Sequence, residues 1–221
     1  MKLKQNLDAI LYDKIIESLI LHEYSMGEQI SLDSLVHKYG VSRTPVVQAV
    51  RLLTNEGVLE GLSNGRVRVP IFTIEEKKQI LGVRLLLESY AVDLIRDNVD
   101  TMQYETFYQS LQSVIDESHA RAAVNDILTF NKMDLKFHRN LVSGSNNKFL
   151  SELYKNIQGR FVVANYLSSN WTIDDFKAAD RSHYKILADF KQKDFDLCKK
   201  DLQEHMMKVC IPSSSKVMCK R

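Results

Sequence analysis

The chain has little cysteine, no long apolar run and almost no excess of charge. Its three cysteines, Cys198, Cys210 and Cys219, are odd in number and lack close paired spacing, so neither a disulfide scaffold nor a zinc knuckle is indicated. No apolar run approaches the roughly eighteen residues of a membrane span, and no signal peptide is evident. We therefore expect a cytoplasmic protein without a membrane partner.

The chain also lacks a marked excess of either positive or negative charge. The chain carries a formal net charge of +2, and residues 1–70 hold eight basic and eight acidic side chains. This balance argues against non-specific nucleic-acid binding driven by charge alone. It leaves room for a local basic stripe, for which the candidates are Arg43, Arg51, Arg66 and Arg68.

The most informative stretch that is present runs from Gly40 to Val46 and reads Gly-Val-Ser-Arg-Thr-Pro-Val. Gly40 can take the positive φ that ends one helix, and Ser42 can cap the next. Apolar residues at helical spacing after Pro45 predict a buried side. The other side offers donors for phosphates and base edges, and the predicted DNA contacts there are Ser42, Arg43, Thr44, Gln48 and Arg51. For this motif alone, an ordinary capped helix is the alternative.

The order of the neighbouring elements favours a DNA-reading helix. An amphipathic helix over 7–23 precedes a short extended piece at 29–30 and a helix that Ser31 can cap. Two short alternating runs, 58–60 and 66–69, flank Asn64-Gly65, which is a strong hairpin signal. Three helices and a hairpin predict a winged helix-turn-helix with Asn64 and Arg66 in the wing. One such module should bind modestly, which favours a homodimer on a palindromic operator.

Residues 1–70 resemble the GntR family of bacterial transcription regulators. The matching motifs are Gly27-Glu28-Gln29-Ile30, Tyr39 through Val46, and Asn55-Glu56-Gly57-Val58. The resemblance implies double-stranded DNA as a partner. Val47 stands where the family usually has arginine, in the middle of the predicted DNA face, and could touch a thymine methyl. The family's operator sequences therefore do not transfer to this chain.

Beyond Pro70 the pattern is helical, with almost no strand signal. After a linker at 71–73, Thr73 and Glu76 form a predicted capping box, and Thr172 with Asp175 forms another. The predicted helices span 74–97, 101–122, 126–143, 147–167, 173–191 and 194–210. Their short connections predict an all-α, antiparallel six-helix bundle over residues 74–211. Residues 212–221 form a short basic tail that we expect to be disordered.

The bundle contains a candidate metal site. Asp134 and His138 are four residues apart and share a helix face, while His183 and His205 lie within the last two helices. Imidazole and carboxylate suit zinc, nickel or manganese, and four ligands leave positions for water or an anion. For any one histidine alone, an ordinary core or boundary position is the commoner explanation. We accept that explanation for His22, His37 and His119.

Residues 73–210 are similar to the FCD ligand-binding domain of the FadR subfamily of GntR regulators. The matching segments are Val83 through Glu88, Asp134, Phe137-His138-Arg139, Asn146-Asn147, His183, Ile186-Leu187 and His205. The resemblance implies that Asp134, His138, His183 and His205 bind a divalent metal, with zinc the first choice, and that Arg84 helps to hold a carboxylate effector. The complete ligand set argues against the metal-free branch that binds fatty acyl-CoA. Six helices resemble the VanR-type branch.

Arg84 lies in an apolar run, 80–87, so its guanidinium is expected to be partly buried and must then be paired. Its partner is either a carboxylate of the bundle, such as Glu88 one turn on, or an organic acid whose other end reaches the metal. We favour the organic acid. The sequence thus predicts a regulator, not an enzyme, whose operator affinity depends on a small carboxylate. The alternative is a metal-dependent hydrolase or lyase. The lack of an evident general base beside the four ligands argues against this alternative.

Overall fold

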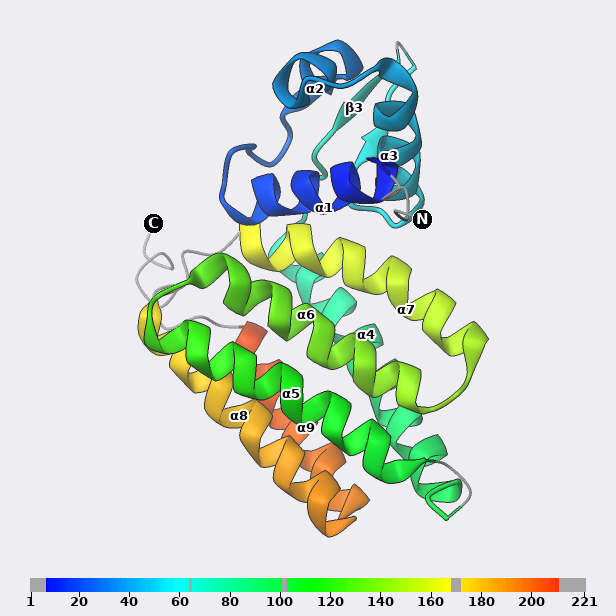
Figure 1. Cartoon of the computed structure of the whole chain (residues 1–221), viewed down its shortest axis with the longest axis vertical. Helices are drawn as coiled ribbons and strands as arrows, with labels where there is room; N and C mark the ends of the chain where they lie inside the picture. Colours follow the sequence, from blue (N-terminus) through cyan, green and yellow to red (C-terminus); the bar gives the residue numbers. More distant parts are fainter. Residues whose placement is uncertain (1–6, 64, 101–102, 168–171, 211–221) are drawn as a thin grey trace, which may run out of the picture. The chain divides into compact units, whose positions relative to one another are not determined.

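The computed structural model describes residues 7–63, 65–100, 103–167 and 172–210 (Figure 1). It is mainly helical with one small antiparallel sheet, which confirms the predicted fold class. Packing divides the chain into two compact units, the first formed by Met1–Lys77 and Asn156–Ser168, the second by Lys78–Lys155 and Ser169–Arg221. Among the described residues, no helix combines the length and apolar character needed to cross a membrane.

The first unit contains a winged helix-turn-helix. Its elements are α1 (Leu7–Ile20), β1 (Gln29–Ser31), α2 (Leu32–Tyr39), α3 (Arg43–Asn55), β2 (Glu60–Gly61) and β3 (Arg66–Arg68). The strands form an antiparallel sheet in the order β1-β3-β2, with Ile30 opposite Val67. Leu19, Leu35 and Leu53, one from each helix, are fully buried. The three amphipathic helices therefore share one apolar core, as their periodicity predicts.

The predicted turn before α3 is present. The Ser31 side chain accepts a hydrogen bond from the Ser34 amide at 3.0 Å and so caps α2. Gly40 ends α2 at φ 64°, a left-handed conformation that glycine adopts without steric cost. Ser42 occupies the N-cap position of α3, but its side chain makes no capping hydrogen bond. That hydroxyl is exposed at the start of the helix.

Two predicted boundaries in this unit are wrong, and the backbone shows why. Helix α1 ends at Ile20 instead of Glu23, because His22 turns to φ 56° and the Glu23 amide donates to the Ser18 carbonyl at 2.9 Å. Val58 and Leu59 are not in a strand. Their amides both donate to the Leu53 carbonyl, at 2.9 and 3.2 Å, so these buried residues close the end of α3.

The helical part of the chain follows the predicted spans closely. Its elements are α4 (Ile74–Asp97), α5 (Tyr104–Ala123), α6 (Ile127–Gly144), α7 (Lys148–Phe161), the π-helix η1 (Val162–Leu167), α8 (Ile173–Gln192) and α9 (Phe195–Cys210). Both predicted capping boxes, at Thr73 and at Thr172, are formed. The predicted single helix over 147–167 instead changes to π geometry at Val162, where five consecutive residues are buried.

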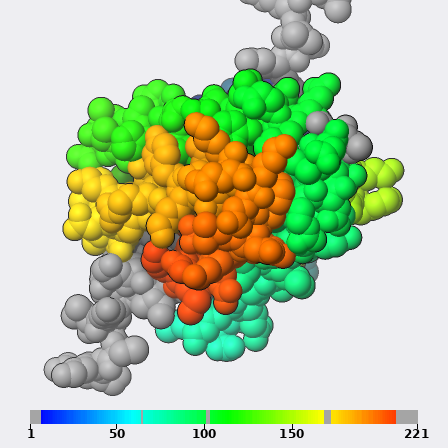
Figure 2. All heavy atoms as spheres, turned by 90° about the horizontal axis from the view of Figure 1, so that it is seen from below, coloured from blue at the N-terminus to red at the C-terminus, as the bar shows by residue number. Residues whose placement is uncertain are grey.

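The core of the second unit lies between its helices. Leu111 of α5, Leu141 of α6, Ile186 of α8 and Leu202 of α9 are each 0% exposed and belong to one cluster of buried residues. On the face drawn in Figure 2, the side chains of α8 and α9 fill the centre and those of α5 lie beside them. The bundle interior on which the candidate site depends is therefore closely packed.

The end of α7 packs in the first unit. A Cβ on Gly159 would lie 2.4 Å from the carbonyl oxygen of Glu56, so the helix backbone approaches the turn after α3 directly. The segment 156–168 thus groups with residues 1–77, although the predicted domains place it in the bundle. The predicted limits 1–70, 71–73 and 74–211 stay predictions, and the tail 212–221 lies outside the described residues.

Candidate functional site

The four predicted metal ligands come together in the second unit. The Nε2 atom of His138 lies 3.2 Å from Nε2 of His205 and 3.3 Å from Nε2 of His183. Asp134 Oδ1 lies 3.2 Å from Nε2 of His183 and 3.8 Å from Nε2 of His138. One ligand atom from each of the four residues lies within 4.8 Å of the others. Three helices, α6, α8 and α9, supply this set.

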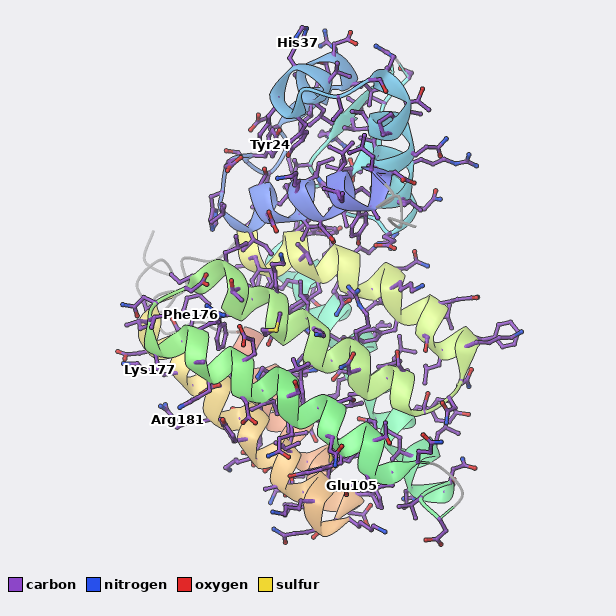
Figure 3. All side chains as sticks on the ribbon, in the orientation of Figure 1. Tyr24, His37, Glu105, Phe176, Lys177 and Arg181 are labelled. Atoms are coloured by element: carbon purple, nitrogen blue, oxygen red, sulfur yellow. The ribbon has the colours of Figure 1, made fainter. Side chains whose placement is uncertain are left out.

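Helix periodicity explains how these side chains reach one place. Asp134 and His138 are one turn apart on α6 and are both buried. On α8, His183 follows the inward residues Phe176 and Asp180 at spacings of seven and three, and exposed Lys177 and Arg181 lie on the other side. Figure 3 shows Lys177 and Arg181 projecting outward from α8. The polar ligands thus occupy core positions of amphipathic helices.

Burial and neighbouring charges favour the protonation states that a cation needs. Burial lowers the pKa of His138, and it lowers the pKa of His205 well below the ordinary histidine value, so both rings are neutral near pH 7. Burial alone would raise the pKa of Asp134, but its contact with His183 and the charges around it hold that pKa well below its usual range. A carboxylate beside neutral imidazoles is ready to bind a divalent ion without first losing protons.

The donor spacing fits one shared cation. Where zinc binds imidazole at about 2.0–2.1 Å, neighbouring ligand nitrogens lie about 2.9–3.4 Å apart. The separations of 3.2 and 3.3 Å between imidazole Nε2 atoms fall in that range. Asp134 Oδ1 lies 3.2 Å from Nε2 of His183, so the carboxylate faces the same point as the imidazole nitrogens. A divalent metal such as zinc, held at that point, would take one lone pair from each of the four side chains.

Arg84 has the carboxylate partner that the alternative interpretation named. It is 1% exposed, and its Nε donates to Glu88 Oε1 at 2.8 Å and to the Tyr154 hydroxyl at 3.1 Å. Its effector-binding role therefore stays a prediction. Sequence reasoning missed Tyr154, which lies seventy residues from Arg84 along the chain, and did not connect Glu88 with the metal site.

Glu88 links Arg84 to the ligand set. Its Oε2 atom lies 2.7 Å from Nδ1 of His138, whereas Nε2 of the same ring faces the other predicted ligands. Burial alone would raise the pKa of Glu88, but His138 and Arg84 lower it overall, so the carboxylate is charged. The predicted metal site therefore has a second layer of buried polar side chains.

The predicted DNA face lies on the exposed side of α3. Val46, Ala49, Val50 and Leu53 are buried against the rest of the unit. The exposed residues on the other side include the predicted contacts Ser42, Arg43, Thr44, Gln48 and Arg51, together with Val47. This separation is what a helix needs to lie in a major groove while its other side packs.

The basic residues around α3 differ in their intramolecular contacts. Arg43 forms a hydrogen-bonded ion pair with Asp33 of α2, and both side chains are largely exposed. Arg68 donates to Glu60 across the β2–β3 pair, with its Nε 3.0 Å from Oε2. Arg66 is exposed on β3, while Asn64 lies outside the described residues. In the predicted stripe, Arg43, Arg51 and Arg66 are therefore exposed and Arg68 is half-buried, and Arg43 and Arg68 each contact an acidic side chain.

Comparisons with known proteins agree with both halves of this picture. Residues 8–69 match the model of the bacterial regulatory proteins of the gntR family, and residues 79–208 match that of the FCD domain. The HTH-type transcriptional regulator YdhC of Bacillus subtilis is 26% identical over 90% of this chain and 87% of its own length. The gluconate operon transcriptional repressor of Bacillus licheniformis is 24% identical over 87% of this chain and 77% of its own length.

Solved structures share the fold. Escherichia coli McbR/YncC superposes with a TM-score of 0.76 at 21% identity, covering 91% of this chain and 94% of that one. A GntR regulator of Rhodococcus sp. RHA1 superposes with a TM-score of 0.74 at 18% identity, covering 97% of both chains. The winged helix, the helical bundle and both matched models lead to one assignment. This chain belongs to the GntR family of bacterial regulators, in the group with an FCD effector-binding domain, and is a DNA-binding transcription regulator.

Proposed function

We propose that this chain is a metal-dependent transcription regulator whose affinity for its operator is set by a small carboxylate effector. The observation that carries the proposal is the convergence of Asp134, His138, His183 and His205 within 4.8 Å in a chain that also has a winged helix. The buried set fits zinc best, with nickel or manganese as alternatives. The proposed metal site is on α6, α8 and α9, and the proposed operator contacts include residues of α3 and β3.

The metal would supply an electrophilic anchor for the effector. With Asp134, His138, His183 and His205 as protein ligands, nickel or manganese would keep positions for a further oxygen ligand, and zinc would take one by expanding to five-coordination. A carboxylate of the effector can fill such a position because oxygen anions bind these ions well. Arg84 adds a permanent positive charge in the same buried region, and this charge helps to keep the pKa of Asp134 low. Two relatives regulate gluconate operons, so sugar acids belong among the compounds to be tried.

The regulator would bind its operator as a homodimer in the cytoplasm. Each α3 would enter a major groove at one half of a palindrome, with Ser42, Arg43, Thr44, Gln48 and Arg51 toward phosphates and bases. Asn64 and Arg66 would reach from the wing. An effector shifts the operator affinity only as far as it binds one conformation better than the other.

An exposed apolar stripe on the second unit gives the homodimer a candidate interface. The stripe consists of Val83, Leu86 and Tyr90 on α4 and Phe149 and Leu153 on α7, each 43–68% exposed. The two helices also meet in the interior, where Arg84 Nε donates to the Tyr154 hydroxyl at 3.1 Å. Apolar patches on folded proteins commonly mark association sites. A second copy would bury the stripe against itself around a two-fold axis.

Sedimentation of two charge variants tests the interface. Leu86→Asp places a charge in the middle of the stripe and should convert the dimer to monomer. Val124→Asp is the control, because Val124 is 67% exposed in the α5–α6 connection, outside the stripe. Monomeric wild-type protein, or a dimeric Leu86→Asp variant, would overturn the interface assignment.

The main test combines metal analysis with DNA binding. Elemental analysis of the purified protein should find one divalent ion per chain, which Asp134→Ala removes while the fold remains. Operator fragments selected from random DNA should show an affinity that changes when gluconate or another small carboxylate is added. That response should vanish in Asp134→Ala. Wild-type protein that binds no divalent metal contradicts the proposal, and turnover of the added acids would indicate the metalloenzyme instead.

Arg84→Lys separates the two roles of Arg84. If the guanidinium holds the effector, the variant should lose carboxylate affinity by a larger factor than zinc affinity, because lysine cannot form a bidentate pair. If it holds only Glu88, zinc affinity should fall at least as much. Calorimetric titration with zinc, and then with the carboxylate, gives both numbers.

A further inference from the structure

Behind His138 lies a buried polar cluster made of Glu88, Arg84 and Tyr154. All three side chains are 0–1% exposed, and they come from α4 and α7, neither of which supplies a metal ligand. The two oxygens of Glu88 have separate partners. Oε1 accepts from Arg84 Nε at 2.8 Å and from the Tyr154 hydroxyl at 2.7 Å, while Oε2 lies 2.7 Å from His138 Nδ1.

We propose that Glu88 is a positioning residue that keeps the proton of His138 on Nδ1, so that the lone pair of Nε2 faces the cation. The inference rests on the metal site proposed above. A carboxylate can only accept hydrogen bonds, so the short contact with Glu88 Oε2 requires His138 Nδ1 to be the donor. A neutral imidazole has one N–H, and Nε2 is therefore bare.

Arg84 and Tyr154 hold Glu88 in this role. Both donate to the same oxygen, Oε1, which fixes the rotation of the carboxylate and leaves Oε2 for His138. A side-chain amide in place of the Glu88 carboxylate cannot make the same three contacts. In a Glu88→Gln side chain, the one remaining acceptor would stay with the two donors, so the NH₂ group would face His138 Nδ1. Nδ1 would then have to accept, and the proton would move to Nε2, where a metal must bind.

His205 provides an internal contrast. Its Nδ1 atom is buried and makes no hydrogen bond within the described part of the chain. Among the described residues, Nδ1 of His205 thus lacks the carboxylate acceptor that Glu88 provides for Nδ1 of His138. Outer carboxylates that orient metal-bound histidines typically contribute 10- to 100-fold to metal affinity.

Nitrogen-15 NMR of histidine-labelled, metal-free protein measures the tautomers directly. In the wild type, His138 should show the pattern of a protonated Nδ1 and a bare Nε2. Glu88→Gln should invert that pattern and lower zinc affinity about 10- to 100-fold in competition with a chromophoric chelator. Tyr154→Phe removes one of the two donors to Oε1 but leaves Glu88 in place. It should keep the wild-type tautomer and lose less affinity than Glu88→Gln.

Glu105→Gln is the matched control, because it makes the same chemical change on the exposed side of α5, where Glu105 is labelled in Figure 3. It should leave both the tautomer and the zinc affinity unchanged. A wild-type His138 protonated on Nε2, or a Glu88→Gln protein with unchanged tautomer and affinity, overturns the inference. If Glu88→Gln does not fold, the wild-type tautomer still decides. If the wild type binds no zinc, the proposed function fails, yet the metal-free spectra test Glu88 independently.

Discussion

The exposed face of α3 and the buried site between α6, α8 and α9 both use polar side chains, but they hold them differently. On α3, Arg51, Gln48 and Thr44 are exposed, and the contact that the structure shows for Arg43 is a surface ion pair with Asp33. In the buried site, Asp134 and His138 are in contact with further polar groups on several helices. One region leaves its side chains adjustable, and the other fixes them before any ligand arrives.

This difference has energetic consequences. Exposed charges act independently and are screened by salt, so their contributions to DNA binding should add. Buried groups that share hydrogen bonds and one cation depend on each other, so their contributions should not add. The comparison therefore predicts the size and the additivity of mutational effects in the two regions.

The largest effect is expected at His138. Replacing it with alanine removes a ligand and leaves Glu88 without its imidazole partner, so zinc affinity should fall by well over the roughly 100-fold that an outer residue contributes. Adding Asp134→Ala should cost little more, because the site is already lost. His119→Ala is the control, since this histidine is 62% exposed and pairs with Asp180. Competition with a chelator measures the zinc affinity of each variant. If the losses in binding free energy from His138→Ala and Asp134→Ala add, the buried groups do not depend on each other and the contrast with α3 is wrong.

Two glycine-to-alanine substitutions compare a crowded and an open helix position through the free energy of unfolding. A Cβ at Gly159 would lie 2.4 Å from the Glu56 carbonyl oxygen, so Gly159→Ala should destabilise the first unit by about 1–3 kcal/mol. Gly82 on α4 has no atom within 4 Å of the corresponding position, and Gly82→Ala should stabilise by about 0.5–1 kcal/mol. Denaturant titration followed by circular dichroism measures both, and equal effects would argue against the close approach at Gly159.

The next effect concerns the exposed arginines of α3. If Arg51 contacts a phosphate, Arg51→Ala should weaken operator binding by about 10-fold and lower the slope of log affinity against log salt concentration by about one. Asp33→Asn releases Arg43 from its ion pair and should strengthen binding a few-fold, with Asp13→Asn as the exposed control on α1. Fluorescence anisotropy over a range of salt concentrations distinguishes these effects. A double variant of Arg43 and Arg51 that departs from additivity would show that this face is coupled after all.

The smallest effect concerns Asp189 on the buried side of α8. Burial, together with the nearby carboxylates of Asp201 and Asp194, raises the pKa of Asp189 to about 6. The folded protein therefore holds this proton more tightly than the unfolded chain does, and stability should fall as the pH rises from about 4 through 6. Asp189→Asn should remove that slope and add about 1 kcal/mol at pH 8. Thermal unfolding at pH 5 and pH 8 checks this, and a larger gain at pH 5 would contradict it.

Local sequence signals predicted the elements well, because caps and apolar periodicity act over a few residues. Gly40, Thr73 and Thr172 take the predicted roles at helix ends. The four side chains predicted as metal ligands from their positions and from the family resemblance lie close together, and their role as ligands stays a prediction. The π-helix after Phe161 was not predictable from a 3.6-residue pattern, because five consecutive buried residues show no periodicity from which a helix type could be inferred.

What the sequence could not show are the contacts between residues that are distant along the chain. Tyr154 meets Glu88 across sixty-six positions, and no local pattern marks that pair. The Arg84–Glu88 ion pair is one helical turn long and was a stated alternative, but the Tyr154 hydroxyl that joins both side chains comes from α7 and only tertiary packing shows it. The association of residues 156–168 with the first unit depends in the same way on tertiary packing.

The central position of β3 in its sheet has a consequence for how such regulators diversify. β3 is hydrogen-bonded to β2 on one side and to β1, more than thirty residues earlier, on the other. The strand is therefore anchored independently of the loop that leads into it from β2. If the wing contacts the operator as proposed, that loop can change in length and in side chains while β3 keeps its hydrogen bonds to β1, so target preference can change without loss of the fold.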